Sequence, residues 1–147
     1  MKKIILIIIA LSLALSSYSQ KEQIKLSSYK ISTPYINASH TQIENRDYVY
    51  IGFQNIEYSS ITDIHSIMLS KQVDLNQFAE DLKDAISRAK LKKTVYWDSN
   101  NKYKIYVYDF TNAIYISDTK SISGHTSLSV KKAQKLLDWI TTIKLQE

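Results

Sequence analysis

Hydrophobic residues recur at three- and four-residue steps between Asp74 and Lys90, which is the spacing of one face of an α-helix. The members of this stripe are Leu75, Phe78, Ala79, Leu82, Ala85, Ile86 and Ala89. Asp74 precedes the stripe and Gln77 stands three residues later, an arrangement typical of a capping box. Acidic residues gather near the start and basic residues at the end, as the helix dipole favours. The pattern predicts a helix over 74–90 that begins at an Asp74 cap.

A second stripe with helical spacing lies near the end of the chain. It consists of Val130, Ala133, Leu136, Leu137, Ile140 and Ile143. Ser129 comes directly before this stripe, and a serine hydroxyl is a preferred acceptor for the free amides of a first helical turn. The sequence therefore predicts a final helix capped by Ser129.

Short runs rich in aromatic and β-branched residues predict strands before each helix. These runs are Tyr29–Ser32, Tyr48–Phe53, Ile56–Thr62, Ile64–Leu69, Thr94–Trp97, Tyr103–Phe110 and Ala113–Asp118. The more polar segments Gln20–Ser28 and Ile36–Arg46 are expected to form a lead-in and a loop. Strands followed by a helix, twice, predict an α+β fold. We expect one antiparallel sheet of about six to eight strands with two helices packed on one face.

A short motif indicates that this order arose by duplication. The pattern F-x-N-x-x-Y-x-S begins at Phe53 and again at Phe110. The two residues Leu128-Ser129 before the last helix correspond to Val73-Asp74 at nearly the same offset. We interpret the chain as two copies of a β-meander-plus-helix unit, at about 29–91 and 94–145.

The first residues have the three parts of a secretory signal peptide. Lys2 and Lys3 give a positive start, Ile4–Leu15 is almost purely apolar, and small residues flank Tyr18 at the expected cleavage site. An apolar helix of twelve residues spans about 18 Å, less than the roughly 30 Å hydrocarbon core of a bilayer. We therefore predict a signal peptide over 1–19, export to the periplasm or medium, and no stable membrane span after cleavage.

Composition limits what the exported part can be. Cleavage after residue 19 leaves 128 of the 147 residues, enough for a single α+β domain over 20–147. The net charge falls from +5 to about +3 because two lysines are removed, and so small an excess does not indicate nucleic acid. The chain has no cysteine and two distant glycines, which excludes disulfides, thiolate chemistry and a glycine-rich phosphate loop. No cofactor is expected.

Asp63 and His65 are the strongest candidates for chemistry. On a strand, residues two apart point to the same face. A carboxylate and an imidazole together could ligate a metal ion or form a base with its orienting group. Spacing supplies no third ligand, so the pair is a weak metal candidate, and exposed polar residues are the simpler interpretation. A small hydrolase or metal-dependent enzyme that uses this pair is the alternative function.

Tyrosine is the most distinctive feature, since the chain contains 11. Alternation along the strand Tyr103–Phe110 places Tyr106, Tyr108 and Phe110 on one face. The other face carries Tyr103, Ile105 and Val107. If the helices cover this second face, the aromatic row is exposed and available to sugars or peptides. Otherwise the tyrosines are merely good strand residues.

The sequence leads us to expect an exported, non-enzymatic binding or interaction domain. The expected contacts are Tyr106, Tyr108 and Phe110, and the expected partner is a protein or a glycan. A further possibility is an inhibitor or subunit that pairs with a partner through an edge strand, for which Tyr29–Ser32 is the candidate.

Overall fold

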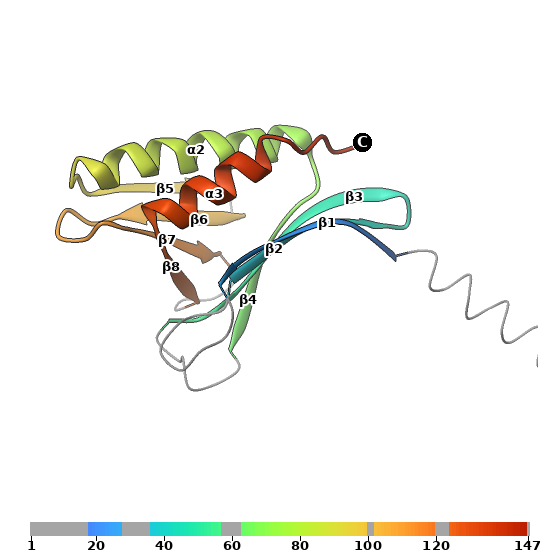
Figure 1. The fold of residues 1–147 in the computed structure, drawn as a ribbon, viewed down its shortest axis with the longest axis horizontal. Helices are drawn as coiled ribbons and strands as arrows, with labels where there is room; N and C mark the ends of the chain where they lie inside the picture. Colours follow the sequence, from blue (N-terminus) through green and yellow to red (C-terminus); the bar gives the residue numbers. More distant parts are fainter. Residues whose placement is uncertain (1–17, 28–35, 57–62, 100–101, 120–123, 147) are drawn as a thin grey trace, which may run out of the picture.

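The computed structural model describes residues 18–27, 36–56, 63–99, 102–119 and 124–146 (Figure 1). Within these ranges the chain forms eight strands and two helices. They are β1 (Tyr18–Ser27), β2 (Ile36–Ile43), β3 (Arg46–Gln54), β4 (Ile64–Leu69), α2 (Gln72–Lys90), β5 (Val95–Ser99), β6 (Tyr103–Val107), β7 (Ala113–Asp118), β8 (His125–Ser129) and α3 (Val130–Ile140).

The strands form two antiparallel sheets of four, in the orders β1-β2-β3-β4 and β5-β6-β7-β8. Both helices contact the second sheet and each other, and Figure 1 shows them over one face of that sheet. The predicted α+β class and the helices on one face are confirmed. The prediction of a single sheet of six to eight strands is wrong. Helix α2 separates β4 from β5, and each meander forms its own four-stranded sheet. The sheets meet where β3 and β4 contact β8 and β7.

Four strands followed by a helix occur twice, which agrees with duplication of a meander-plus-helix unit. The first unit begins at Tyr18, earlier than predicted. The repeated motif does not mark equivalent places, however. Phe53 lies in β3, the third strand of its unit, whereas Phe110 lies in the turn after β6, the second strand of its unit. The repeat is therefore carried by the order of elements, and the motif gives the wrong alignment.

Three strands are absent from the sequence prediction. β1 occupies most of the expected lead-in, β2 occupies the expected loop, and β8 ends at the Ser129 cap in a stretch where no strand was expected. β2 pairs along its whole length with β3, and the hairpin turns at Glu44 and Asn45, which both have positive φ as in a type I′ turn. Three consecutive polar residues of β2 are buried, so the hydrophobic alternation that marks a strand is missing there. The predicted strand Tyr29–Ser32 and most of Ile56–Thr62 lie outside the described residues.

Helix α2 buries all seven residues of the predicted stripe. Its start differs from the prediction, because the N-cap is Lys71 and no side chain caps the helix. Asp74 lies inside the first turn and forms an ion pair with Lys102 in the turn directly before β6. The capping role of Ser129 in α3 is confirmed, since its Oγ accepts a hydrogen bond from the Lys132 amide at 3.4 Å. Within the part of the chain that the structure describes, no helix is long and apolar enough to cross a membrane.

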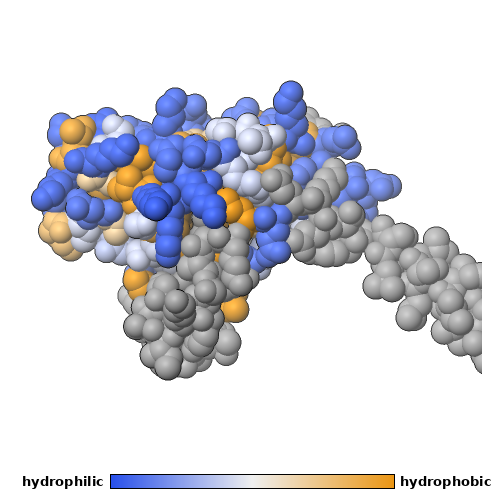
Figure 2. Space-filling model, viewed as in Figure 1, coloured by the Kyte–Doolittle hydropathy of each residue, from blue (hydrophilic) through white to orange (hydrophobic). Residues whose placement is uncertain are grey.

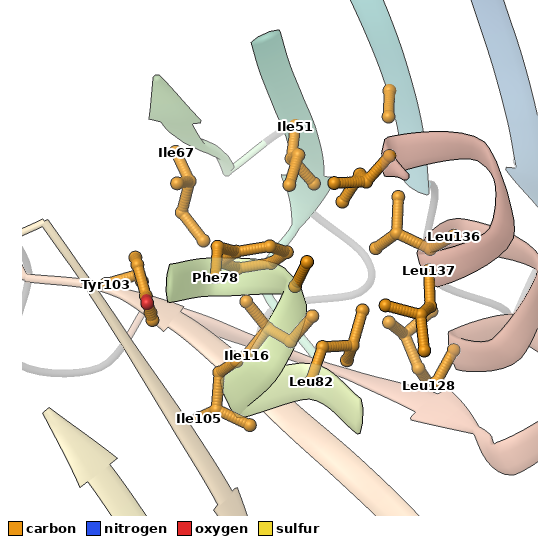
Figure 3. Close-up of a cluster of buried hydrophobic side chains, with 14 of the residues drawn as sticks. Ile51, Ile67, Phe78, Leu82, Tyr103, Ile105, Ile116, Leu128, Leu136 and Leu137 are labelled. Atoms are coloured by element: carbon orange, nitrogen blue, oxygen red, sulfur yellow. The ribbon is translucent and has the colours of Figure 1, made fainter. Parts of the chain in front are cut away.

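One hydrophobic core joins both sheets to both helices. In Figure 3, Phe78 of α2 lies beside Tyr103 of β6, and Ile67 of the first sheet lies above the two rings. The rings of Phe78 and Tyr103 meet edge to face, with centroids 4.8 Å apart. Leu82 of α2 extends the same contact toward Leu137 of α3. Apolar side chains of both helices thus cover the helix-facing side of the second sheet.

A buried carboxylate fixes α2 on β6. Tyr103 is 0% exposed, and its hydroxyl donates a hydrogen bond of 2.7 Å to Asp81 Oδ2. Gln77 Nε2 donates to the other oxygen of Asp81 at 2.8 Å. Burial of the phenol, followed by its hydrogen bond to Asp81, raises the pKa of Tyr103. The phenol is therefore a neutral hydrogen-bond donor at neutral pH.

The C-terminal segment is also part of the fold. Leu145 is buried, and its amide donates to Gln72 Oε1 at 2.8 Å. The Gln146 amide donates at 3.2 Å to the buried carboxylate of Asp47, which lies 3.4 Å from His40 Nε2. The last residues thereby connect α2 to the β2–β3 hairpin.

We predict that Tyr103→Phe lowers the free energy of unfolding by about 1–3 kcal/mol, because Asp81 Oδ2 loses the Tyr103 donor in a buried site while Oδ1 keeps its bond from Gln77. Urea denaturation measures the change. Tyr96→Phe is the matched control, since the Tyr96 hydroxyl bonds to Asp98 on the exposed face, and it should cost less than about 0.5 kcal/mol. Equal losses for the two variants would contradict the role given to Asp81.

Candidate functional site

The face of the second sheet opposite the helices carries a continuous group of rings, which we call the aromatic face. Its members are Tyr96, Tyr106, Tyr108, Phe110, Tyr115 and His125. The strand register produces it, because Tyr96 pairs with Tyr106, and Tyr106 pairs with Tyr115, on adjacent strands. Tyr103, Ile105 and Val107 point the other way and are buried, as the alternation along β6 predicts.

Tyr106 is the centre of this group. Its ring stacks on Tyr115 with centroids 5.2 Å apart and planes within 5°. It also contacts the rings of Tyr96, Tyr108 and His125 at 6.4, 5.5 and 6.2 Å. Tyr106 and Tyr115 stack on each other and are partly buried. They therefore mainly support the more exposed rings of the aromatic face.

The accessible ring surface lies at the two ends of the group. Phe110 is 79% exposed and Tyr96 is 56% exposed, whereas Tyr108 between them is 38% exposed. Phe110 lies in the turn after β6 and not on the strand as predicted, yet it stacks on Tyr108 at 5.2 Å and so stays on the same side. Of the three predicted contacts, Phe110 is the most accessible and Tyr106 the least.

Sequence reasoning missed Tyr96, Tyr115 and His125 as members of this group. All three lie on strands, but alternation within one strand cannot say which residues of other strands share its face. The missing information is the register, which pairs Tyr106 with both Tyr96 and Tyr115.

A row of polar residues runs beside the rings on the same face. Asp98 on β5 pairs with Lys104 on β6, with their charged groups 4.0 Å apart and both side chains more than one third exposed. The Tyr96 hydroxyl donates to Asp98 Oδ2 at 3.3 Å. An exposed ion pair of this length contributes at most about 1 kcal/mol. Both charged groups can therefore turn toward a ligand at small cost.

The two candidates for metal or acid–base chemistry lie together at the junction of the sheets. His65 Nε2 is 3.1 Å from Asp63 Oδ1, and His65 Nδ1 is 3.0 Å from Asp118 Oδ2. Asn55 Nδ2 donates to the second oxygen of Asp63 at 2.9 Å. The ring of Phe53 stacks on the imidazole with centroids 6.0 Å apart. Asp118 was missed because it lies 53 residues away, at the end of β7, and no spacing links it to His65.

This arrangement is suited to bridging the sheets. Each ring nitrogen of His65 faces a different carboxylate, so the three groups do not converge on one point. In the described ranges, no cluster of three or more His, Cys, Asp or Glu residues could hold a metal ion. A general base needs a ring nitrogen free to take a proton from substrate, and here both nitrogens face carboxylates.

The charges around His65 set its protonation. Burial of the ring lowers the pKa of His65, but the hydrogen bonds to Asp63 and Asp118 and their negative charges outweigh it, so the pKa is raised overall. The hydrogen bond from Asn55, followed by that from His65, lowers the pKa of Asp63. The raised pKa widens the pH range over which a protonated His65 pairs with both carboxylates, and this pairing links β4 to β7.

No protein-family model matches the chain, and no curated protein is significantly similar to it. Its function must therefore be inferred from the two clusters described above.

We predict a pH-dependent contribution of His65 to stability. A raised histidine pKa stabilises the folded state fully below about pH 6.5, its value in an unfolded chain, and this contribution is lost as pH rises through the raised value. The contribution of Asp63, whose pKa is lowered, is present above about pH 3.9 and lost as pH falls through its folded value.

Urea denaturation of wild type and His65→Gln from pH 4 to pH 9 measures this effect. The difference in unfolding free energy should be largest between about pH 4 and 6.5 and should shrink at higher pH. A difference that stays constant with pH would show that the imidazole acts only through packing, for example against Phe53.

Proposed function

We propose that the protein is an exported, non-enzymatic binding domain that holds a protein or glycan ligand on its aromatic face. The observation that carries this proposal is the exposed group of rings on the sheet face that the helices leave open. At roughly 200 Å² per aromatic side chain, the exposed fractions of Tyr96, Tyr108 and Phe110 correspond to about 350 Å². Patches of this size on monomers are often functional.

The surface on the helix side supports the same choice of face. Figure 2 shows mostly hydrophilic residues over α2 and α3. On α2 the outward residues include Glu80, Lys83 and Ser87, all of them exposed. A solvated helix surface of this kind offers a ligand little to bury, in contrast to the opposite face of the sheet.

Export is inferred from the signal-like sequence at 1–19. A cleavage before Gln20 would remove the first two residues of β1, which pair with Ile43 and Gln42 at the end of β2. Eight residues of β1 would remain, so the sheet keeps its edge strand.

The enzymatic alternative at Asp63 and His65 receives less support. Both ring nitrogens of His65 lie within 3.1 Å of carboxylate oxygens. A catalytic or metal-binding role would require one of these contacts to open. The link between β4 and β7 explains the same contacts without further assumptions.

We predict that Phe110→Ala abolishes ligand capture by the immobilised protein without unfolding it. The ligands are offered as a glycan array and as a detergent extract of cell envelopes, and folding is followed by circular dichroism. Leu91→Ala is the matched control, because Leu91 is 60% exposed but lies at the C-cap of α2 and is not a member of the aromatic face. Tyr106→Ala is a poorer probe, since it removes the centre of the stack.

Ligands that bind wild type and Leu91→Ala equally but not Phe110→Ala support the proposal. If every captured ligand binds Phe110→Ala as well as wild type, the aromatic face is not the binding surface and the proposal fails.

A further inference from the structure

We infer that the ligand of the aromatic face is a neutral oligosaccharide, an inference that rests on the proposed function and specifies its ligand. The first argument is area. A stable protein interface buries about 800 Å² on each partner. The exposed ring surface of about 350 Å² is less than half of that. A chain of a few sugar units can be covered by such a surface.

The second argument is the shape of the accessible ring surface. A pyranose has one or two faces made of C–H groups, and these pack flat against an aromatic ring. Phe110 and Tyr96 offer exposed rings for such contacts at the two ends of the face. Tyr106 and Tyr108 connect them through successive ring contacts, with centroids 6.4, 5.5 and 5.2 Å apart. The two exposed rings are thus separate contact points joined by one connected group of rings, which suits a chain of several sugar units.

The third argument is the placement of polar groups beside each exposed ring. Tyr96 is accompanied by Asp98 and Lys104, whose weak ion pair can open to bind sugar hydroxyls. Phe110 is accompanied by Asp109 and by Asn112, both exposed in the same turn. Carboxylates accept and carboxamides both donate and accept, so these groups match the equatorial hydroxyls of a sugar whose C–H face rests on the ring.

The charges on this face favour a neutral sugar over an acidic one. On β5, on β6 and in the turn after β6, the charged residues beside the rings are Asp98, Lys104 and Asp109, and His125 lies within the ring group. On these elements one lysine accompanies two carboxylates, so they carry no excess positive charge to attract a uronic acid or a sulfated sugar.

The face is also fixed before a ligand arrives. Tyr106 and Tyr115 are held by their mutual stack, and Tyr108 and Phe110 by theirs. The Asp109 amide donates to Thr94 Oγ1 at 2.9 Å, which ties the turn bearing Phe110 to the start of β5. Rings that are already ordered lose little conformational entropy on binding, so even a small contact area can give measurable affinity.

The test is titration of the isotope-labelled protein with cellohexaose, chitohexaose, maltohexaose and hexagalacturonate, followed by NMR. At least one neutral hexasaccharide should shift resonances of the aromatic face, and Phe110→Ala and Tyr96→Ala should each weaken its binding at least tenfold. Leu91→Ala should leave it unchanged. Binding of hexagalacturonate in preference to all three neutral chains would overturn the inference of neutrality.

Absence of binding by all three neutral hexasaccharides, or binding that both ring variants retain, overturns the glycan inference. In that case the capture experiment with envelope extract decides about the broader proposal. A purified protein partner that binds wild type and Leu91→Ala but not Phe110→Ala would keep the binding function and change the ligand class. If no ligand of any kind depends on Phe110, both proposals fail together.

Discussion

The packing of α2 against β6 determines which surface of the second sheet can meet a partner. Phe78 fills the space over Tyr103, and Asp81 accepts the Tyr103 hydroxyl, so apolar contact and a buried hydrogen bond fix the same pair of elements. Because residues alternate along a strand, burying Tyr103 and Ile105 necessarily turns Tyr106 outward. The exposed rings are thus a direct consequence of where the helix binds.

The junction between the sheets combines different kinds of contact. Apolar residues of both sheets enter one core, and a backbone hydrogen bond of 2.8 Å joins the Ile56 amide to the His125 carbonyl. The ionic bridge through His65 adds a link between β4 and β7. His125 belongs to the aromatic face through its side chain, so the same residue connects the aromatic face to the segment that follows β3.

Sequence patterns predicted the parts of the fold in which the hydrophobic period is intact. The bounds of β4 and β7, the buried stripe of α2 and the cap at Ser129 all followed from local rules. β2 escaped prediction because Ser39, His40 and Thr41 are buried polar residues in a strand paired on both sides. Tyr96 in the aromatic face and Asp118 beside His65 could not be predicted either, since both depend on contacts between distant segments.

The buried Asp47 has a consequence for the order in which the molecule matures. This carboxylate receives the Gln146 amide across 99 residues of chain, and Leu145 is bonded to the first residue of α2. Neither bond can form until nearly the whole polypeptide has been synthesised. Contacts of such long range are slow to form, because the chain entropy of closing the loop is lost before the contact stabilises it. Formation of these two hydrogen bonds, which connect the end of the chain to α2 and β3, is therefore a late event in folding.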